Sequence, residues 1–148
     1  MTRFWLPVAV LLTGLLAGVY YAFAVGVAPG LGQLPDDGFV AAMNRVNQAI
    51  VNPAFMLSFL GAPVVTLVAV LVARDRTARP RWLLAGLLLN VAGLLITLLA
   101  NVPLNDDLLA GGGREAYELT WLCWNVARTV VTTAACACLI VAMTPRRG

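Results

Sequence analysis

Long hydrophobic runs separated by short polar segments dominate this chain. Four such runs cover residues 4–27, 53–72, 82–100 and 121–143, and none contains more than one charged residue. A helix needs about 20 apolar residues to cross the roughly 30 Å hydrocarbon layer of a membrane. The pattern therefore predicts an all-α integral membrane protein, a four-helix bundle that forms a single domain over residues 1–148.

Residues 36–50 differ from these runs because polar residues alternate with apolar ones at helical spacing. The hydrophobic positions recur at steps of four, three and four residues, and amides and an arginine occupy the other faces. This pattern is typical of an amphipathic helix at a membrane surface. We therefore expect a short interfacial helix between the first and second spans. Its hydrophobic positions are Phe39, Met43, Val46 and Ile50.

Proline, asparagine and acidic residues predict where these helices begin and end. Asp36 or Asp37 is expected to cap the amphipathic helix, and Asn52-Pro53 is expected to cap and open the second span. Pro29 is expected to end the first helix, because it is followed by two nearby glycines. Pro103 is expected to prevent a simple helical continuation beyond the third span.

The first run also has features of a cleavable signal peptide. Arg3 precedes it, and Ala22-Phe23-Ala24 fits a small-x-small cleavage pattern. However, the run is much longer than the usual hydrophobic region of about 7–15 residues, and three further spans follow. We therefore expect a retained first helix.

Basic and acidic residues are distributed unevenly around the spans. Seven of the ten arginines lie near the chain ends or between the second and third spans, whereas six of the seven acids lie in segments 28–52 and 101–120. The positive-inside rule then predicts a multi-pass protein of the cell membrane with both termini in the cytoplasm. The net charge of +3 thus indicates topology, and no nucleic-acid partner is expected. The seven arginines are Arg3, Arg74, Arg76, Arg79, Arg81, Arg146 and Arg147.

Small residues recur every four positions along the first helix, at Gly14, Gly18, Ala22, Gly26 and Gly30. Such a ridge allows another helix to approach closely. Helix packing is the preferred interpretation, and a homo-oligomer formed through Gly14, Gly18 and Gly26 is a further possibility.

Some types of chemistry are disfavoured by composition. The chain has no histidine, which removes the commonest acid–base group and the usual zinc and copper ligand. Its three cysteines are not spaced as a metal motif, and we interpret them as small packing residues. No metal and no cofactor are therefore expected, and any catalysis would rest on carboxylates.

Two polar residues are predicted to lie within the membrane. Asn90 falls near the middle of the third span and is expected to hydrogen-bond across helices. The segment from Thr129 to Met143 has only 15 residues, about 22 Å of helix, so Arg128 is expected several ångströms inside the membrane. An arginine there requires a partner or a wet cavity, unless its side chain reaches back to the surface.

Polar and aromatic residues converge at the outer ends of the spans. A cavity lined by amides, aromatic rings and one cation suits a flat, lipophilic ligand with phenol or carbonyl oxygens. Trp121 is expected to belong to the interfacial aromatic belt, whereas Trp124 fits the belt and the cavity equally well. The residues expected to form the site are Tyr20, Asn44, Asn47, Asn52, Asn101, Asn105, Asp106, Trp124, Asn125 and Arg128.

Two motifs carry a resemblance to a known family. Asn101-Val-Pro-Leu-Asn-Asp106, followed by Trp121/Trp124-Asn125-x-x-Arg128, resembles the anthrone oxygenase-like family of small four-helix membrane proteins. Asn44-x-x-Asn47, Asn52-Pro53 and the glycine-rich first helix also match, so the resemblance covers residues 10–143. It implies oxidation of anthrones to anthraquinones without a recognised cofactor.

That reaction assigns roles to the predicted site residues. Asp106 is the best candidate for the base that removes a proton from the substrate, since histidine is absent. Arg128, assisted by Asn101, Asn105 and Asn125, is the candidate stabiliser of the enolate oxygen. Trp124 is expected to stack on the substrate ring.

A non-catalytic function is the alternative. The same bundle would then bind a lipid, a quinone or a partner helix within the bilayer. The position of the glycine ridge distinguishes these functions, because a ridge on the outside of the bundle favours a partner helix.

Overall fold

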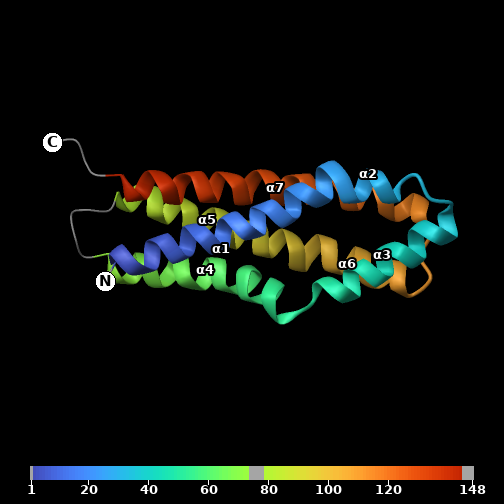
Figure 1. Cartoon of the computed structure of the whole chain (residues 1–148), viewed down its shortest axis with the longest axis horizontal. Coiled ribbons are helices and arrows are strands. Elements are labelled where there is room, and N and C mark those ends of the chain that lie inside the picture. The colour runs from blue at the N-terminus through green and yellow to red at the C-terminus, as the bar shows by residue number, and fades with distance from the viewer. Residues whose placement is uncertain (1, 74–78, 145–148) are drawn as a thin grey trace.

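The computed structural model describes residues 2–73 and 79–144, whose long helices run side by side along one axis (Figure 1). Four helical stretches are long and apolar enough to cross a membrane, which supports the predicted all-α, multi-pass bundle: Phe4–Leu31, Pro53–Val72, Pro80–Leu109 and Arg114–Met143. In chain order the helices are α1 (Thr2–Ala22), η1 (Phe23–Val27), α2 (Ala28–Leu31), α3 (Asp36–Ile50), α4 (Pro53–Val72), α5 (Pro80–Ile96), η2 (Thr97–Asn101), α6 (Val102–Leu109) and α7 (Arg114–Met143), where η1 and η2 are π-helical.

The four spans form a ring in which each helix packs against two neighbours. α1 packs on α4 and α7, and α5 packs on the same two helices. The start of α1 and the end of α7 lie at one end of the bundle, and α2, α3 and α6 gather at the other (Figure 1). α4 is the shortest span, with 20 residues against 28 to 30 in the others. Beyond the start of α4, the helix that packs on α6 and α7 is α3.

A polar cluster joins three helices inside the bundle. Asn90 of α5 donates from Nδ2 to the hydroxyl oxygens of Thr13 (3.1 Å) and Thr66 (3.2 Å). All three side chains are buried. The predicted cross-helix hydrogen bonding of Asn90 is therefore confirmed, and it connects α1, α4 and α5.

Two π-helical turns carry the chain past its prolines. Proline has no N–H to donate, and its ring clashes with the carbonyl four residues earlier. η1 and η2 each end two residues before a proline, Pro29 and Pro103, and their wider turns accommodate this defect. The first helix continues through Pro29 and ends at Leu31 with Gly32 at its C-cap, so it ends within the predicted segment from Pro29 to Gly32 and not at the proline itself. Pro103 was expected to prevent a simple helical continuation, and the third helix does continue into α6, but through the π-helical turn η2 and not as a regular α-helix.

The two predicted helix caps had different outcomes. Asn52 accepts a hydrogen bond from the Phe55 N–H at 3.1 Å, so the predicted cap of α4 is confirmed. Neither Asp36 nor Asp37 caps α3, which has no side-chain cap. The capping prediction was wrong because the N-cap position is Pro35, which places both aspartates inside the first turn of the helix. Asp36 pairs with Arg114 at 3.2 Å.

The amphipathic helix α3 runs obliquely along the bundle (Figure 1). Its apolar face is buried in protein, where Phe39 and Met43 pack in one cluster with Leu108, Tyr117 and Trp121. The helix is present with the predicted periodicity. Its location at the membrane surface stays a prediction.

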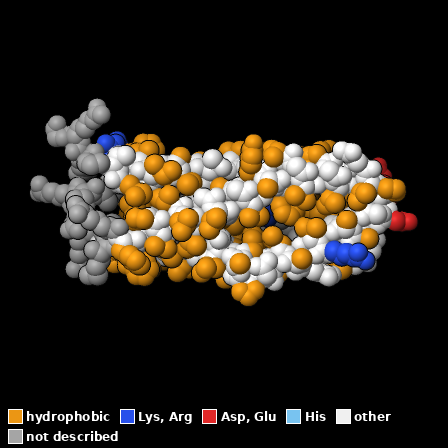
Figure 2. All heavy atoms as spheres, viewed as in Figure 1, with side chains coloured by type: hydrophobic (Ala, Val, Ile, Leu, Met, Phe, Trp, Pro, Cys, Tyr) orange, Lys and Arg blue, Asp and Glu red, His pale blue; other side chains and the backbone are white. Residues whose placement is uncertain are grey.

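Hydrophobic side chains cover the long middle of the face in Figure 2, and the charged side chains that protrude from it lie toward its two ends. This distribution suits a bundle surrounded by lipid. Four of the arginines behind the predicted orientation, Arg74, Arg76, Arg146 and Arg147, lie outside the described residues, as does the side chain of Arg3. The cytoplasmic location of the termini therefore stays a prediction.

The glycine ridge of the first helix faces two environments. A Cβ atom added at Gly14 would lie 3.7 Å from the sulfur of Cys136, so this position faces α7 inside the bundle. At Gly18, Gly26 and Gly30, an added Cβ would meet nothing within 4 Å. Most of the ridge therefore lies on the outside of the described bundle.

Candidate functional site

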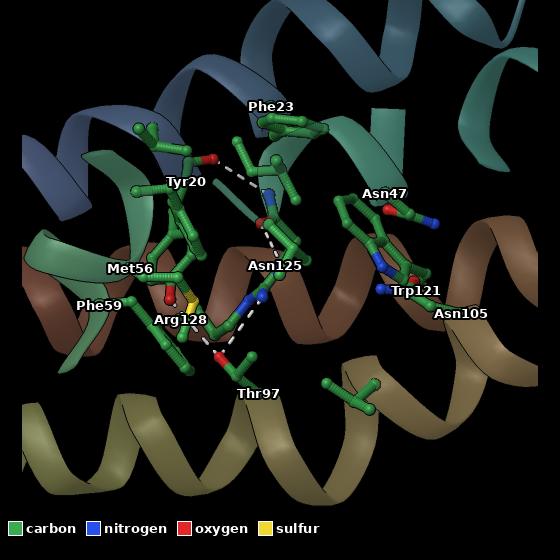
Figure 3. A pocket seen from close by; sticks show the side chains of 15 residues that line it. Tyr20, Phe23, Asn47, Met56, Phe59, Thr97, Asn105, Trp121, Asn125 and Arg128 are labelled. Carbon is green, nitrogen blue, oxygen red and sulfur yellow. Dashed lines mark hydrogen bonds between the residues drawn. The ribbon is translucent and has the colours of Figure 1, made fainter. Parts of the chain in front are cut away.

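A cavity of about 240 Å³ lies beside the junction between α3 and α4. In Figure 2, which views the bundle across its long axis, blue atoms are recessed among the hydrophobic side chains near the middle of this face. The cavity is therefore reached from the side of the bundle, and Figure 3 shows it from close by. Its lining residues are Val19, Tyr20, Phe23, Asn47, Ile50, Val51, Phe55, Met56, Phe59, Thr97, Val102, Asn105, Trp121, Asn125 and Arg128.

Arg128 occupies one end of this cavity and is only 6% exposed. Its Nη2 donates to Asn125 Oδ1 at 2.8 Å, and its Nη1 makes a longer bond to the Thr97 hydroxyl at 3.4 Å. The guanidinium carbon lies 4.4 Å from the ring centre of Tyr20 and 5.4 Å from that of Trp121. The cation is thus held by an amide, a hydroxyl and two π faces.

The position of Asn125 links this site to the π-helical turn η1. Asn125 Nδ2 donates to the backbone carbonyl of Tyr20 at 3.0 Å, one turn before η1 begins. The same amide accepts from Arg128 through its oxygen. Asn125 therefore uses both ends of its side chain, which fixes the orientation that presents Oδ1 to the guanidinium.

No acidic side chain lies among the lining residues, and no carboxylate pairs with Arg128 in the described part of the chain. Arg128 Nε and Trp121 Nε1 are buried without a hydrogen-bond partner there. Arg128 lines the cavity and carries a positive charge, which makes this end of the cavity suitable for an anionic oxygen or for ordered water.

A second polar group lies at the opposite end of the cavity. Asn47 Nδ2 donates to the Tyr117 hydroxyl at 3.3 Å, and that hydroxyl donates to Asn105 Oδ1 at 2.8 Å. Asn47 comes from α3, Asn105 from α6 and Tyr117 from α7. This hydrogen-bonded group, Asn47–Tyr117–Asn105, is called the amide end below.

Aromatic rings form much of the wall between the two ends. Trp121 lies 6.1 Å from the Tyr117 ring, nearly parallel to it, and 5.9 Å from the ring of Phe23. Phe55 and Phe59 stack on each other at 5.5 Å on the α4 side. The flat apolar walls suit a planar aromatic ligand.

Five of the predicted site residues line the cavity: Tyr20, Asn47, Asn105, Asn125 and Arg128. They come from four helices, α1, α3, α6 and α7.

The other five predicted residues, Asn44, Asn52, Asn101, Asp106 and Trp124, are not among the lining residues. Asn52 is exposed and uses its side chain to cap α4. Asn101 is buried and donates to the Trp121 carbonyl at 3.4 Å. Asp106 is exposed, and Trp124 is 43% exposed. The structure therefore separates these side chains from the cavity that holds Arg128.

Sequence reasoning missed several residues of this site. Trp121, assigned to the aromatic belt, is buried and lines the cavity, which corrects that assignment. Tyr117 was not considered, although it shares a face of α7 with Trp121, Asn125 and Arg128 at steps of four, four and three. That spacing was the available signal, because residues at such steps lie on one side of a helix.

Comparison with known proteins agrees with the motifs. Residues 39–138, which extend from α3 through most of α7, match the family described as anthrone oxygenase. No curated protein and no solved structure gave a match. Since the matched region covers well over half of the chain, this protein belongs to the anthrone oxygenase family.

Proposed function

We propose that this protein is a membrane oxygenase-like enzyme that acts on a lipophilic phenolic substrate of the anthrone type. The observation that carries the proposal is the buried guanidinium of Arg128, which has no carboxylate partner in the described chain. Such a cation costs several kcal/mol in an apolar environment unless an anion or water compensates it. The oxygen of an ionised phenol or enol would supply that compensation.

The reaction needs a stabilised anion more than it needs a cofactor. Loss of a proton from the anthrone methylene gives an enolate whose negative charge rests largely on oxygen. This electron-rich anion can pass electrons to dioxygen directly. In the complete reaction the methylene becomes a carbonyl, one oxygen atom enters the product, and the other leaves as water. Arg128 would lower the free energy of the enolate because its charge is already positioned and poorly solvated.

The proposal assigns no contact with the substrate to Asp106. That side chain is exposed and is not among the lining residues. Water at the cavity mouth would instead accept the proton, because the methylene of an anthrone is already acidic and becomes more so beside a cation. The expected carboxylate base is therefore absent from the proposed reaction, which depends on stabilisation of the enolate by Arg128.

Access from the side of the bundle supports a lipophilic substrate. The cavity is recessed in a face covered by hydrophobic side chains (Figure 2). A planar phenolic compound dissolved in the bilayer could therefore enter without crossing the polar ends of the bundle.

Oxygen consumption provides the test. The purified protein in lipid nanodiscs is expected to accelerate oxygen uptake by 1,8-dihydroxyanthrone above the protein-free rate. Arg128→Gln should lower the accelerated rate by about 100-fold or more, as removal of an oxyanion stabiliser does elsewhere. Asp106→Asn should retain most of the activity.

The matched control is Arg45→Gln, since Arg45 is an exposed arginine of α3 that does not line the cavity. It should keep the wild-type rate. An unaccelerated reaction with the wild-type protein across several anthrones and hydroquinones would contradict the enzymatic proposal. A severe loss in Asp106→Asn would return the base to Asp106.

A non-catalytic function is favoured by a different observation. Gly18, Gly26 and Gly30 leave open space on the outer face of the first helix. We therefore propose, as the second candidate, that this face docks a partner helix or a second copy of the chain. Gly14 takes no part in that surface because it faces Cys136 inside the bundle.

A further inference from the structure

The hydroxyl of Tyr117 fixes the orientation of two asparagine side-chain amides in the cavity. It has one proton, which it donates to Asn105 Oδ1, and its oxygen accepts from Asn47 Nδ2. The two remaining polar atoms, Asn47 Oδ1 and Asn105 Nδ2, make no hydrogen bond within the described chain, and neither belongs to its buried, unpaired polar atoms. One acceptor and one donor are thus left available in a cavity that both asparagines line.

Tyr117 is held firmly enough to keep this arrangement. Its side chain is 3% exposed and lies between the rings of Phe39 (6.2 Å) and Trp121 (6.1 Å). A ring packed on both sides cannot swing to another partner without opening the aromatic cluster of α3 and α7. The direction of the Asn47–Tyr117–Asn105 hydrogen bonds is therefore built into the fold.

The amide end and Arg128 lie on opposite sides of Trp121. Figure 3 shows Asn47 and Asn105 beyond Trp121, and Arg128 with Thr97 and Tyr20 on its other side. The guanidinium carbon is 5.4 Å from the Trp121 ring, which is itself 6.1 Å from the Tyr117 ring. The two polar ends are therefore separated by the width of a fused-ring system.

We infer that Asn47 and Asn105, oriented by Tyr117, form a second binding subsite for an uncharged hydroxyl group at the far end of a planar ligand. A hydroxyl would donate to Asn47 Oδ1 and accept from Asn105 Nδ2. An ionised oxygen suits this end poorly, because it would face an amide oxygen with no cation among the contacts of the amide end. Arg128 takes the ionised oxygen, so the cavity fixes which end of the ligand is anionic. This inference rests on the proposed function, since it uses the same cavity.

Two related probes measure the subsite directly. 2,6-Dihydroxyanthraquinone carries hydroxyl groups at opposite ends, and 2-hydroxyanthraquinone lacks one of them. Binding to the protein in nanodiscs is followed by absorbance at a pH where one hydroxyl is ionised. We expect the dihydroxy compound to bind about tenfold more tightly, because each hydrogen bond to a polar group otherwise left unpaired is worth a factor of this size.

The ratio of the two affinities is the readout, because a general effect on folding would not change it selectively. Tyr117→Phe removes the hydroxyl and keeps the packed ring, and it should bring the ratio close to one. Asn105→Leu should do the same. Tyr21→Phe is the matched control, since Tyr21 is exposed and does not line the cavity. Arg128→Gln should weaken both probes by a similar factor and leave the ratio intact.

The outcomes separate this inference from the proposed function. Equal binding of the two probes to the wild-type protein would overturn the subsite alone. A preference that survives in both Tyr117→Phe and Asn105→Leu would also overturn it. Failure of both probes to bind would overturn the cavity as a phenolic site, and the subsite with it. Circular dichroism of each variant establishes that the helices are retained.

Discussion

At the scale of single residues, the state of Arg128 decides what the cavity can bind. Its guanidinium contacts an amide oxygen, a hydroxyl and two aromatic rings, all of them neutral. These groups orient the cation without cancelling its charge. A carboxylate in the same place would form an ion pair and remove the attraction for an anionic ligand.

A substitution of Thr97 tests whether the uncompensated charge of Arg128 attracts an anionic ligand. Its hydroxyl lies 3.4 Å from Arg128 Nη1, and it lines the cavity. Thr97→Asp should pair with Arg128 and weaken binding of ionised 2-hydroxyanthraquinone by tenfold or more, because the added carboxylate neutralises the site. Thr97→Asn has nearly the same shape without the charge, and it should weaken binding much less. Equal effects of the two variants in a binding titration would contradict the role given to the charge.

At the scale of elements, the contact between α5 and α7 sets the frame for the site. Gly86 of α5 faces Leu139 of α7, and an added Cβ would lie 2.6 Å from Leu139 Cδ2 and 3.4 Å from the Ala135 carbonyl oxygen. Leu139 is fully buried, so it has little room to move away. The two helices can therefore pack this closely only with glycine at position 86.

The corresponding prediction compares two glycines. Gly86→Ala should lower the free energy of unfolding by about 1–3 kcal/mol through overpacking, despite the better helix propensity of alanine. Gly18→Ala, where an added Cβ meets nothing within 4 Å, should be neutral or stabilising by up to about 1 kcal/mol. Thermal unfolding in detergent would measure both. A stabilised Gly86→Ala variant would mean that α5 and α7 are less tightly packed than described.

The π-helical turns act at the same scale, since they set the direction of the side chains around the cavity. η1 contributes Phe23 and η2 contributes Thr97 to the lining. Each residue added to a helix rotates the following side chains by about 100°, so a π turn moves every later residue to another face. Within α6, Asn105 lines the cavity, whereas Asp106, one residue later, points about 100° away and is exposed.

At the scale of the whole molecule, the bundle keeps an unoccupied ridge on its outer surface. Gly18 and Gly26 lie there with open space before them, beside the exposed Tyr21 and Val25. Small residues of this kind allow close helix contact in lipid. The ridge and the cavity involve different faces of the first helix, so oligomerisation and ligand binding can be tested separately.

Bulky substitution tests the ridge. Gly18→Leu combined with Gly26→Leu should convert an oligomer into a monomer in mild detergent, as measured by light scattering, with ligand binding retained. Leu71→Ala, at an exposed position of α4, is the control and should leave the oligomeric state unchanged. A wild-type protein that is monomeric in detergent and in nanodiscs would contradict a self-association role for this surface.

The sequence alone determined the features that depend on local rules. The four spans, the cap at Asn52 and the cross-helix bonding of Asn90 were predicted, because hydropathy, capping and the cost of a buried amide act wherever those residues occur. The family was also recognisable from its motifs, and half of the predicted site residues line the cavity.

Only the tertiary structure decided which side chains face one another. Pro29 and Pro103 are accommodated by π-helical turns, and the orientation of α6 directs Asn105 to the cavity and leaves Asp106 exposed. On α7 the packing of neighbouring helices buries Trp121 and leaves Trp124 exposed, although both fit a helical stripe. Tyr117 acquires its partners from α3 and α6. Such contacts depend on how helices rotate against one another, which hydropathy along a single chain does not specify.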